Sequence, residues 1–372
     1  MPPALPPTPP GLRRRTVALG LGALGLWPGV APGLNARRLD FPRDHGSHPE
    51  LRTEWWYMTG HAQAAGRLWG FQVTFFRSRV DGTQGLRSAF AAKQLLFAHA
   101  AITDVAHARL HHDQRIARAG FGVAQASEAD TLVRLQDWSL ARSGLPSDPF
   151  HGSRYAARVE GADFGLDLLF DTTQPLLLQG RQGLSRKGPD PAQASYYYSQ
   201  PQLQVRGSIV LQGQRMAMDA ASGRAWMDHE WSEALMHPEA VGWDWIGMNL
   251  HDGSALTAFR LRRADGSALW AGGSWRAPGQ AAQVFDAQAV VFTPERFWTS
   301  PHSGARYPVQ WRVQTQVGVF GVHALLDPQE LDSSGSTGAI YWEGLCDLVD
   351  SAGHRVGRGY LEMTGYAKPL RL

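Results

Sequence analysis

The sequence has almost no cysteine, since Cys346 stands alone and leaves no intrachain disulfide and no cysteine-based metal site. It also lacks helical periodicity over more than three turns. The net charge is only +3, and five arginines before residue 39 account for much of the basic excess. No basic stripe of the kind that follows phosphates is present. These absences exclude a disulfide scaffold and a long helical bundle, and they argue against nucleic acid as a partner.

Short strands and turns fill the chain after residue 40. The length allows two or three domains, and a hydrophobic fraction of 43% is typical of a globular protein. The aromatic-rich run 68–76 alternates as a strand should, and Asp-Gly pairs at 81–82, 252–253 and 265–266 predict hairpins. The stretch Gln182 to Ala194 is the best candidate for a long exposed loop. The fold class predicted from these patterns is all-β.

The first 31 residues are typical of an export signal. Arg13, Arg14 and Arg15 precede a modest apolar stretch, and the small-x-Ala pattern Gly29-Val30-Ala31 follows. Paired arginines resemble a twin-arginine signal, which exports folded proteins. We expect cleavage after Ala31 and a periplasmic or secreted mature chain. An uncleaved anchor is the alternative, although the apolar stretch is short for a membrane span.

Tryptophan is abundant and repeatedly stands beside a carboxylate. The chain has 14 Trp, and the clusters lie at 54–57, 226–231, 242–245 and 341–344. Indole carries a polar N–H that usually finds a partner when it is buried. The repeated pairing favours a lined cavity, and indole–carboxylate hydrogen bonds within a plain core are the alternative.

The run Asp228-His229-Glu230 lies between Trp226 and Trp231 and is the strongest candidate for chemistry. Burial beside indoles penalises charged forms and shifts pKa values. On a regular strand Asp228 and Glu230 share one face and His229 takes the other. A structural strand with core tryptophans and solvated polar residues is the alternative.

Three signatures recur in the same order and predict two homologous β domains. Runs beginning at Glu54, Phe75 and Gly223 correspond to runs beginning at Trp243, Ala258 and Gly357. Closing each copy into a barrel removes its exposed edges and makes its first and last strands neighbours. Glu54 and Trp56 would then lie near Asp228 and His229. The predicted domains are 38–235 and 240–372, joined by a linker around 236–238.

The motifs at 54–60, 196–199, 228–231 and 359–366 together resemble the AttH-like family, also described as predicted secreted hydrolases. This family is more distantly related to carotenoid 1,2-hydratases and to fungal lipocalin-like cyclases and kievitone-type hydratases. The resemblance spans roughly residues 38 to 368. It implies two tandem lipocalin-like antiparallel β-barrel domains and a large hydrophobic ligand, such as a terpenoid, polyene or lipid. The Asp228-His229-x-Trp231 element matches an Asp-His-x-Trp element of the carotenoid hydratases.

Acid–base addition of water to a C=C bond would suit these residue types. A protonated carboxylic acid delivers a proton to carbon, aromatic faces stabilise the cation, and a base activates water. This chemistry needs no metal and no nucleotide. The candidate catalytic residues are Asp228 or Glu230 as acid, His229 as base and Glu54 across the closed barrel. The candidate ligand-binding residues are Trp55, Trp56, Tyr57, Trp231, Trp243, Asp244 and Trp245.

Two alternatives stay open at this point. Asp44, His45 and His48 could bind a metal with Glu54, although two histidines in a Gly-containing loop are usually only a polar loop. The protein could also be a non-catalytic periplasmic carrier of a lipid-like molecule that serves a membrane exporter. The strand 256–260 has neither the Tyr nor the Asp that the hydratase branch carries there, which favours the carrier, whereas the acid–base residues of the Asp228 run favour the enzyme.

Overall fold

The computed structural model describes residues 33–370 together with Met1, and these later residues belong to one compact unit, Pro32–Leu372. The expected export signal and its cleavage site lie outside the described residues. The described residues form three short 3-10 helices, at Arg43–His45 (η1), Asp81–Thr83 (η2) and Ala287–Ala289 (η3). The other regular elements of the described chain are antiparallel strands, which confirms the all-β class. Within the described residues, no helix has the length and apolar character needed to cross a membrane.

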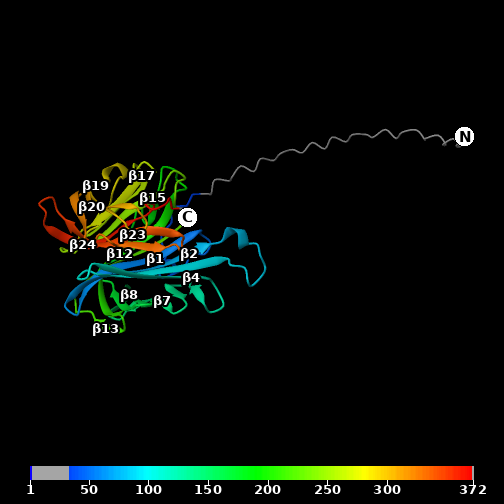
Figure 1. Ribbon diagram of the computed structural model, residues 1–372, viewed down its shortest axis with the longest axis horizontal. Coiled ribbons are helices and arrows are strands. Elements are labelled where there is room, and N and C mark those ends of the chain that lie inside the picture. Colours follow the sequence, from blue (N-terminus) through cyan, green and yellow to red (C-terminus); the bar gives the residue numbers. More distant parts are fainter. Residues whose placement is uncertain (2–32, 371–372) are drawn as a thin grey trace. The chain divides into compact units, whose positions relative to one another are not determined.

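The first sheet has 14 strands and is built from the N-terminal half of the unit (Figure 1). Its main path runs β4-β3-β2-β1-β14-β12-β9-β8-β7-β6-β5. The bounds are β1 Thr53–Ala64, β2 Arg67–Arg79, β3 Gln94–Asp104, β4 Arg109–Arg118, β5 Ala124–Ala126, β6 Leu132–Leu135, β7 Trp138–Leu145, β8 Asp148–Glu160, β9 Phe164–Asp171, β10 Leu177–Leu178, β11 Leu184–Arg186, β12 Ala194–Leu211, β13 Gln214–Ala217 and β14 Gly223–Ala234.

The second sheet has 10 strands and follows after a short connection. Its main path runs β18-β17-β16-β15-β24-β23-β21-β20-β19. The bounds are β15 Gly242–Leu250, β16 Ala255–Arg262, β17 Ala268–Arg276, β18 Gln283–Val284, β19 Val291–Thr299, β20 Arg306–Thr315, β21 Gly318–Ala324, β22 Glu330–Ser333, β23 Ala339–Val349 and β24 Arg355–Met363. This two-sheet architecture is lipocalin-like, as expected.

The first and last long strands of each sheet are neighbours. β1 pairs with β14, which places Trp56 opposite His229 and Tyr57 opposite Asp228. β15 pairs in the same way with β24 and places Trp245 opposite Glu362. The expected proximity of the N-terminal motif to the Asp-His-Glu run is therefore confirmed.

A cross-strand acid–arginine pair recurs in both sheets. Glu54 lies opposite Arg77, and Asp244 lies opposite Arg260. When the two sheets are compared with Glu54 matched to Asp244, the first two repeated signatures correspond. The third signature does not correspond in the same way: Glu54 is paired with Trp231 and Asp244 with Met363, which differs by two residues from the match of Gly223 with Gly357.

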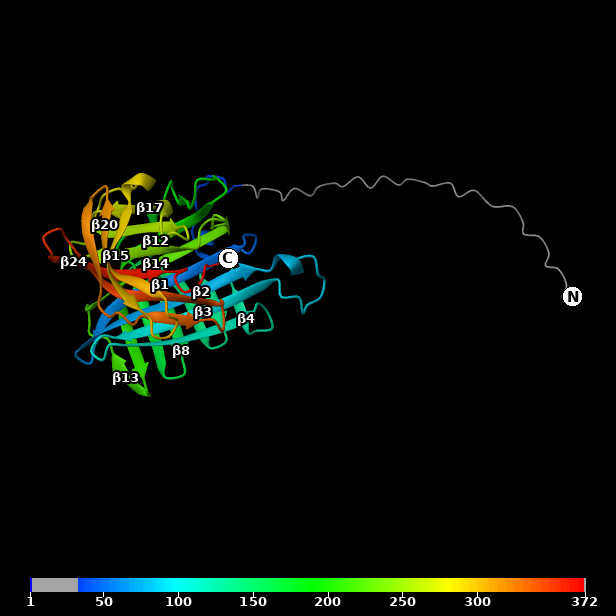
Figure 2. The ribbon, with the colours of Figure 1, turned by 45° about the horizontal axis from the view of Figure 1, so that its top comes forward.

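Strand alternation divides each sheet into an inner and an outer face. Trp56 and Met58 belong to the core enclosed by the first sheet, whereas Trp55 and Tyr57 belong to a separate cluster that packs against the second sheet. The second sheet encloses its own core, which includes the fully buried Trp311. Apolar side chains thus fill both interiors. The two sheets also face each other through their outer faces (Figure 2).

The stretch 182–194 differs from the exposed loop that the sequence predicts. It contains the short strand β11, and the side chains of Ser185, Lys187 and Gln193 are buried. The Trp270 indole of the second sheet donates a hydrogen bond to the carbonyl of Arg186 at 3.0 Å. Glycine and proline marked the turns of this segment correctly, but they carry no information about what packs over it.

Candidate functional site

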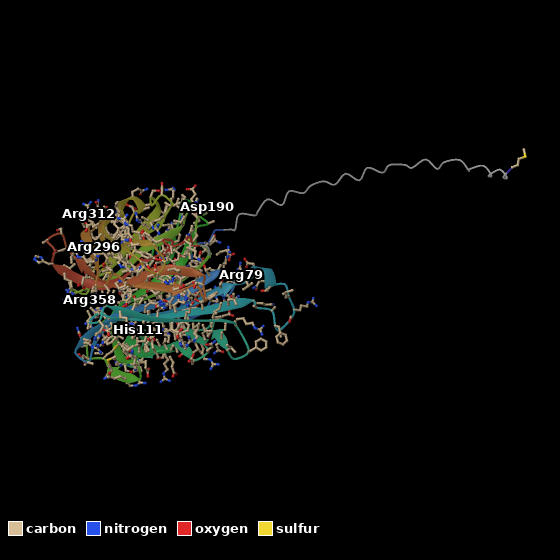
Figure 3. All side chains as sticks on the ribbon, in the orientation of Figure 1. Arg79, His111, Asp190, Arg296, Arg312 and Arg358 are labelled. Carbon is tan, nitrogen blue, oxygen red and sulfur yellow. The ribbon has the colours of Figure 1, made fainter. Side chains whose placement is uncertain are left out.

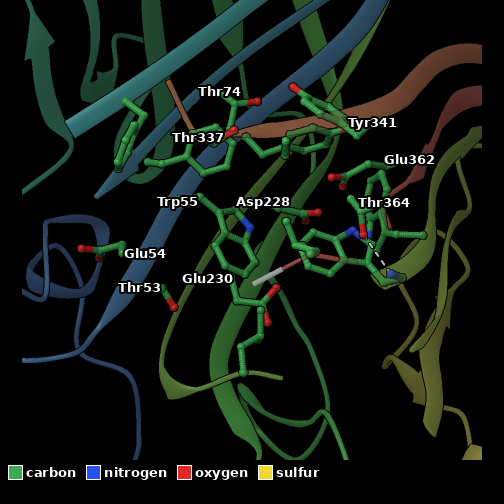
Figure 4. Close-up of a pocket in the computed structure, with 18 of the residues that line it drawn as sticks. Thr53, Glu54, Trp55, Thr74, Asp228, Glu230, Thr337, Tyr341, Glu362 and Thr364 are labelled. Carbon is green, nitrogen blue, oxygen red and sulfur yellow. Dashed lines mark hydrogen bonds between the residues drawn. The ribbon is translucent and has the colours of Figure 1, made fainter. Parts of the chain in front are cut away.

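A cavity of about 300 Å³ lies where the two sheets face each other (Figure 4). Strands of both sheets line it, and β1, β2, β15 and β16 contribute the aromatic side chains of Trp55, Phe76, Trp243, Trp245 and Phe259. Small-molecule sites are commonly concave and apolar with a few converging polar groups. The expected cavity lined by tryptophans is therefore present, and it lies between the two sheets.

Asp228 reaches this cavity from β14 and is fully buried. Its carboxyl group accepts hydrogen bonds from Ser199 Oγ at 2.5 Å, from Trp226 Nε1 at 2.7 Å and from the Tyr197 hydroxyl at 2.9 Å. Burial raises the pKa of Asp228 to about 7, although these hydrogen bonds oppose the rise. Near neutral pH a large fraction of Asp228 is therefore a neutral acid.

Glu230 lies two residues further along β14 on the same face, as the strand periodicity predicts. Its carboxylate forms an ion pair with Lys187 Nζ at 2.8 Å and accepts a hydrogen bond from Ser195 Oγ. The Lys187 ammonium also lies over the rings of Tyr197 and Phe259, at 4.6 and 4.3 Å from their centroids. The cavity therefore holds a lysine-paired carboxyl group, Glu230, beside Asp228, which has no cationic partner among these contacts.

Two further acids enter the cavity from the second sheet. Glu343 on β23 and Glu362 on β24 are cross-strand neighbours; Glu343 is buried and Glu362 is half-buried. Burial and the charge of Glu362 raise the pKa of Glu343 well above its usual value. Burial likewise raises the pKa of Glu362 to about 7, and the charges of Asp228 and Glu230 add to the effect. Figure 4 shows the Glu362 carboxyl group on the side of the cavity opposite Glu230.

Some polar atoms of the cavity have no partner in the described chain. The Tyr57 hydroxyl and Glu343 Oε1 are both buried; the two side chains interact with each other, but neither atom has a hydrogen bond of normal geometry among the described residues. A buried donor or acceptor without a partner costs free energy, and such atoms often mark a ligand or water position. His99, by contrast, is satisfied by the Tyr341 hydroxyl at 2.8 Å and by Ser336 Oγ at 2.9 Å, and burial lowers its pKa to about 3.

His229 lies on the opposite face of β14, inside the first sheet, with no exposed side-chain surface. Its Nε2 is 3.0 Å from Glu54 Oε1, its Nδ1 is 3.1 Å from the Tyr198 hydroxyl, and its ring stacks on Trp56. Burial lowers the pKa of His229 to about 4. His229 does not line the cavity, because residues 228 and 229 point to opposite faces of a regular strand. The expectation that it acts on a ligand there is therefore wrong.

Trp56, Trp231 and Glu54 also face the interior of the first sheet. The two indoles belong to its core, and Trp231 stacks on His48 with ring centroids 4.0 Å apart. Glu54 borders the cavity, but its carboxylate points away from it, as Figure 4 shows. This carboxylate is held by Ser47, His48, Arg77 and His229.

Asp244 likewise turns inward, in the second sheet. Its carboxylate forms ion pairs with Arg260 at 2.7 Å and Arg262 at 3.2 Å, and it accepts a hydrogen bond from the Tyr366 hydroxyl. Four of the ligand-binding residues predicted from the sequence line the cavity: Trp55, Tyr57, Trp243 and Trp245. The odd-numbered positions of β1 and β15 supply these four.

The loop around Asp44 and His48 does meet Glu54, as the metal alternative requires. His48, Glu54 and His229 bring possible ligand atoms within 4.8 Å of one another. However, His48 Nδ1 is 2.7 Å from Glu54 Oε1, and its Nε2 is 3.0 Å from Asp44 Oδ1. Both ring nitrogens of His48 thus have a carboxylate oxygen as partner, and against the effect of burial these contacts raise the pKa of His48. Because both nitrogens are already engaged, the geometry favours a buried polar network that anchors this loop to the sheet.

Sequence reasoning did not assign Lys187, Glu343 or Glu362 to the site. Glu343 stands in a Trp-Glu cluster like that of Glu54, so the aromatic–acid pattern could have suggested it. Glu362 follows Leu361 in the last repeated signature. For Lys187 the sequence carried no signal, because its burial depends on the second sheet covering its segment.

The chain matches the family model described as AttH-like over residues 32–366. A crystal structure named for AttH, from Nitrosomonas europaea, is 44% identical, has a TM-score of 0.81, and covers 91% of this chain and 100% of its own. The protein is therefore a lipocalin-like protein with two β sheets, and it belongs to the AttH-like family.

More distant solved structures share the fold. Kievitone hydratase from Nectria haematococca has a TM-score of 0.68 at 14% identity and covers 89% of this chain and 94% of its own. CghA with Sch210972 has a TM-score of 0.53 at 13% identity, over 84% of this chain and 88% of its own. No curated protein matches the chain. At these identities the likeness concerns the fold alone.

Proposed function

We propose that the protein binds a hydrophobic, unsaturated molecule between its two sheets and adds water to a C=C bond. The observation that carries this proposal is the pair of carboxyl groups on one face of β14: Asp228 is buried in a cavity with aromatic walls, and Glu230 beside it is paired with Lys187. Burial raises the pKa of Asp228 to about 7, and two carboxyl groups in such different environments can serve as an acid and a base in one site.

Each step of the addition has a group in reach. Asp228 donates a proton to one olefinic carbon, and the positive charge on the other carbon is stabilised by the indole faces of Trp55, Trp243 and Trp245. Glu230 takes a proton from the water that attacks this carbon. The proton lost by the water restores the acid after transfer between the two carboxyl groups. The raised pKa values of Glu343 and Glu362 reduce the negative charge of the opposite wall, which suits an apolar ligand.

Structures that share the fold support this reaction class. One of them is named a hydratase, and another holds the small molecule Sch210972. The support is limited to the kind of chemistry that this architecture accommodates, since sequence identity to both is below 15%.

Isotope labelling tests the proposal and identifies the substrate in the same experiment. Purified protein is incubated with an apolar extract of the source cells in H₂¹⁸O, and the extract is compared by mass spectrometry with an extract incubated without protein. We expect at least one unsaturated component to be converted to a product heavier by one labelled water. Exhaustive conversion trials without any labelled product would contradict hydration.

A non-catalytic carrier is the second candidate, and one observation favours it. The Asp228 oxygens are already engaged by Ser199, Trp226 and Tyr197, an arrangement that would also serve a structural role. A carrier would return its ligand unchanged from the same experiment. A lipid-like molecule co-purifying with the protein, with no labelled product, would identify this function.

A further inference from the structure

An exposed apolar patch lies on two loops at one end of the first sheet. The loop patch consists of Leu86 and Phe90, between β2 and β3, and Phe121 and Val123, between β4 and β5. Their exposed fractions are 51%, 74%, 59% and 41%. Clustered apolar side chains of this size on a surface mark an interaction site.

The two phenylalanine rings are held in place. Phe90 and Phe121 stack with ring centroids 5.6 Å apart. The Arg118 guanidinium lies over both rings, 4.3 Å from the Phe121 centroid, and donates a hydrogen bond to the Phe90 carbonyl. Arg134 donates a hydrogen bond to the carbonyl of Gly122. The rings are therefore displayed by a fixed scaffold, which lowers the entropic cost of inserting them into a partner.

Positive charge accompanies the loop patch. The loop 80–93 carries Arg87, Lys93 and one acid, Asp81, which is paired with Arg79 at the base of the loop; the segment 118–123 carries Arg118 and no acid. Arg134 adds a fourth cation through its contact with Gly122, and Asp137 is the acid of the adjoining turn. Exposed aromatics ringed by cations match an anionic bilayer, in which rings enter the interface and cations meet the headgroups. We propose that the loop patch docks this protein on an anionic lipid surface.

The loop patch lies at the same end of the strands as one edge of the ligand cavity. Ser78 on β2 lines the cavity two residues before the loop leaves at Val80, and Phe97 lines it shortly after the loop returns. Arg79, labelled in Figure 3, marks the base of this loop, which projects from the body in Figure 1. Docking through the loop patch turns that edge of the cavity toward the bilayer, where apolar molecules reside. The docking itself does not depend on the proposed reaction.

A second copy of the chain is the competing occupant. In a two-fold dimer the same patch would meet itself, so Arg87 and Arg118 of one copy would approach those of the other. Like charges held together in a desolvated contact oppose such a dimer. The charge pattern therefore favours anionic lipid over self-association.

Vesicle sedimentation of the full chain tests the proposal. The probes are vesicles of equal parts phosphatidylglycerol and phosphatidylethanolamine, and neutral phosphatidylcholine vesicles. We expect F90S/F121S to reduce partitioning onto the anionic vesicles by about tenfold or more, because two exposed rings lose their burial. R118Q should reduce it about fivefold, and high salt should have a similar effect. F297S/R306Q is a matched control, since Arg306 lies 3.8 Å over the exposed Phe297 on the second sheet.

Every outcome decides the proposal. Loss of vesicle binding with F90S/F121S but not with F297S/R306Q supports docking. All variants carry residues 1–31, so any contribution of this segment to vesicle binding is the same in each. Equal sedimentation of wild type and F90S/F121S overturns the proposal. A dimer in light scattering that F90S/F121S converts to a monomer, without vesicle binding, would assign the loop patch to self-association and overturn it as well. Unchanged thermal unfolding of the variants excludes misfolding as the cause.

Discussion

Glu343 on β23 and Glu362 on β24 lie directly opposite each other across two neighbouring strands, and both carboxyl groups border the same cavity. Two buried carboxyl groups at this spacing cannot both ionise without strong repulsion. The pair therefore keeps at least one proton where isolated carboxyl groups would have lost it. This wall of the cavity is thus polar, and it carries less negative charge than two isolated carboxylates would.

The free energy of unfolding should respond to Glu362→Gln in a pH-dependent way. The usual pKa of 4.5 rises to about 7 in the folded chain, so the unfolded chain ionises first as the pH increases. Stability is consequently lost between those two values and not regained above them. Glu362→Gln should match wild type near pH 4 and exceed it by a few kcal/mol at pH 8, at about 1.4 kcal/mol per unit of pKa. Urea unfolding at both pH values measures this.

The exposed Glu295→Gln is the matched control on the same sheet, and it should leave stability unchanged at both pH values. A Glu362→Gln protein that is less stable than wild type at pH 8 would show that the carboxylate is stabilising when charged. That result would contradict the assignment of a protonated wall.

His229→Ala should damage stability and spare the cavity. The substitution removes hydrogen bonds to Glu54 and Tyr198 and leaves a void beside Trp56. We expect the free energy of unfolding to fall by about 2–4 kcal/mol. Binding of the neutral dye Nile red to the folded variant should stay close to that of wild type, as measured by fluorescence titration.

Trp245→Ala provides the converse comparison, because this indole lines the cavity. It should weaken dye binding at least several-fold. If His229→Ala folded with full stability and lost dye binding, His229 would have to act in the cavity after all.

Turnover should depend on the protonated form of Asp228. Burial places the pKa of this carboxyl group at about 7, so the fraction of acid falls as the pH rises through that value. The rate of water addition should be level below about pH 6 and should decrease toward tenfold per pH unit at high pH. Rates measured with the labelled product across this range test the assignment, and a rate that increases above neutral pH would exclude Asp228 as the acid.

Export should require the paired arginines. Replacing Arg14 and Arg15 by lysine keeps the charge but removes the feature that resembles a twin-arginine signal. We expect the protein to remain in the cytoplasm, which fractionation and immunoblotting would reveal. Unchanged periplasmic yield would mean that this route is not used.

Local patterns were sufficient to predict strands, turns and the division of β14 into two faces. Period-two alternation placed Asp228 and Glu230 together and His229 apart, and the register of β14 confirms this. The repeated signatures predicted that Trp56 would approach His229. These inferences succeed because side-chain direction along a strand is fixed by backbone geometry.

Which face of a strand is inside a barrel cannot be read from alternation when both faces are apolar. Trp55 and Trp56 are both large and both buried or half-buried, yet one lines the cavity and the other belongs to the core. Lys187 illustrates the same point, since its burial depends on the second sheet, far away in sequence. Long-range packing decides these cases, and no local property of the residues reports it.

Comparison of wild type with Asp228→Asn tests the central claim most directly. The asparagine keeps the size of the side chain but cannot donate an acidic proton, so the lost interaction acts mainly in the transition state. Once the labelled product has identified the substrate, its binding and its conversion are measured for both proteins. The account predicts that Asp228→Asn binds the substrate within about tenfold of wild type and forms no hydrated product. Hydration at the wild-type rate by Asp228→Asn would contradict it.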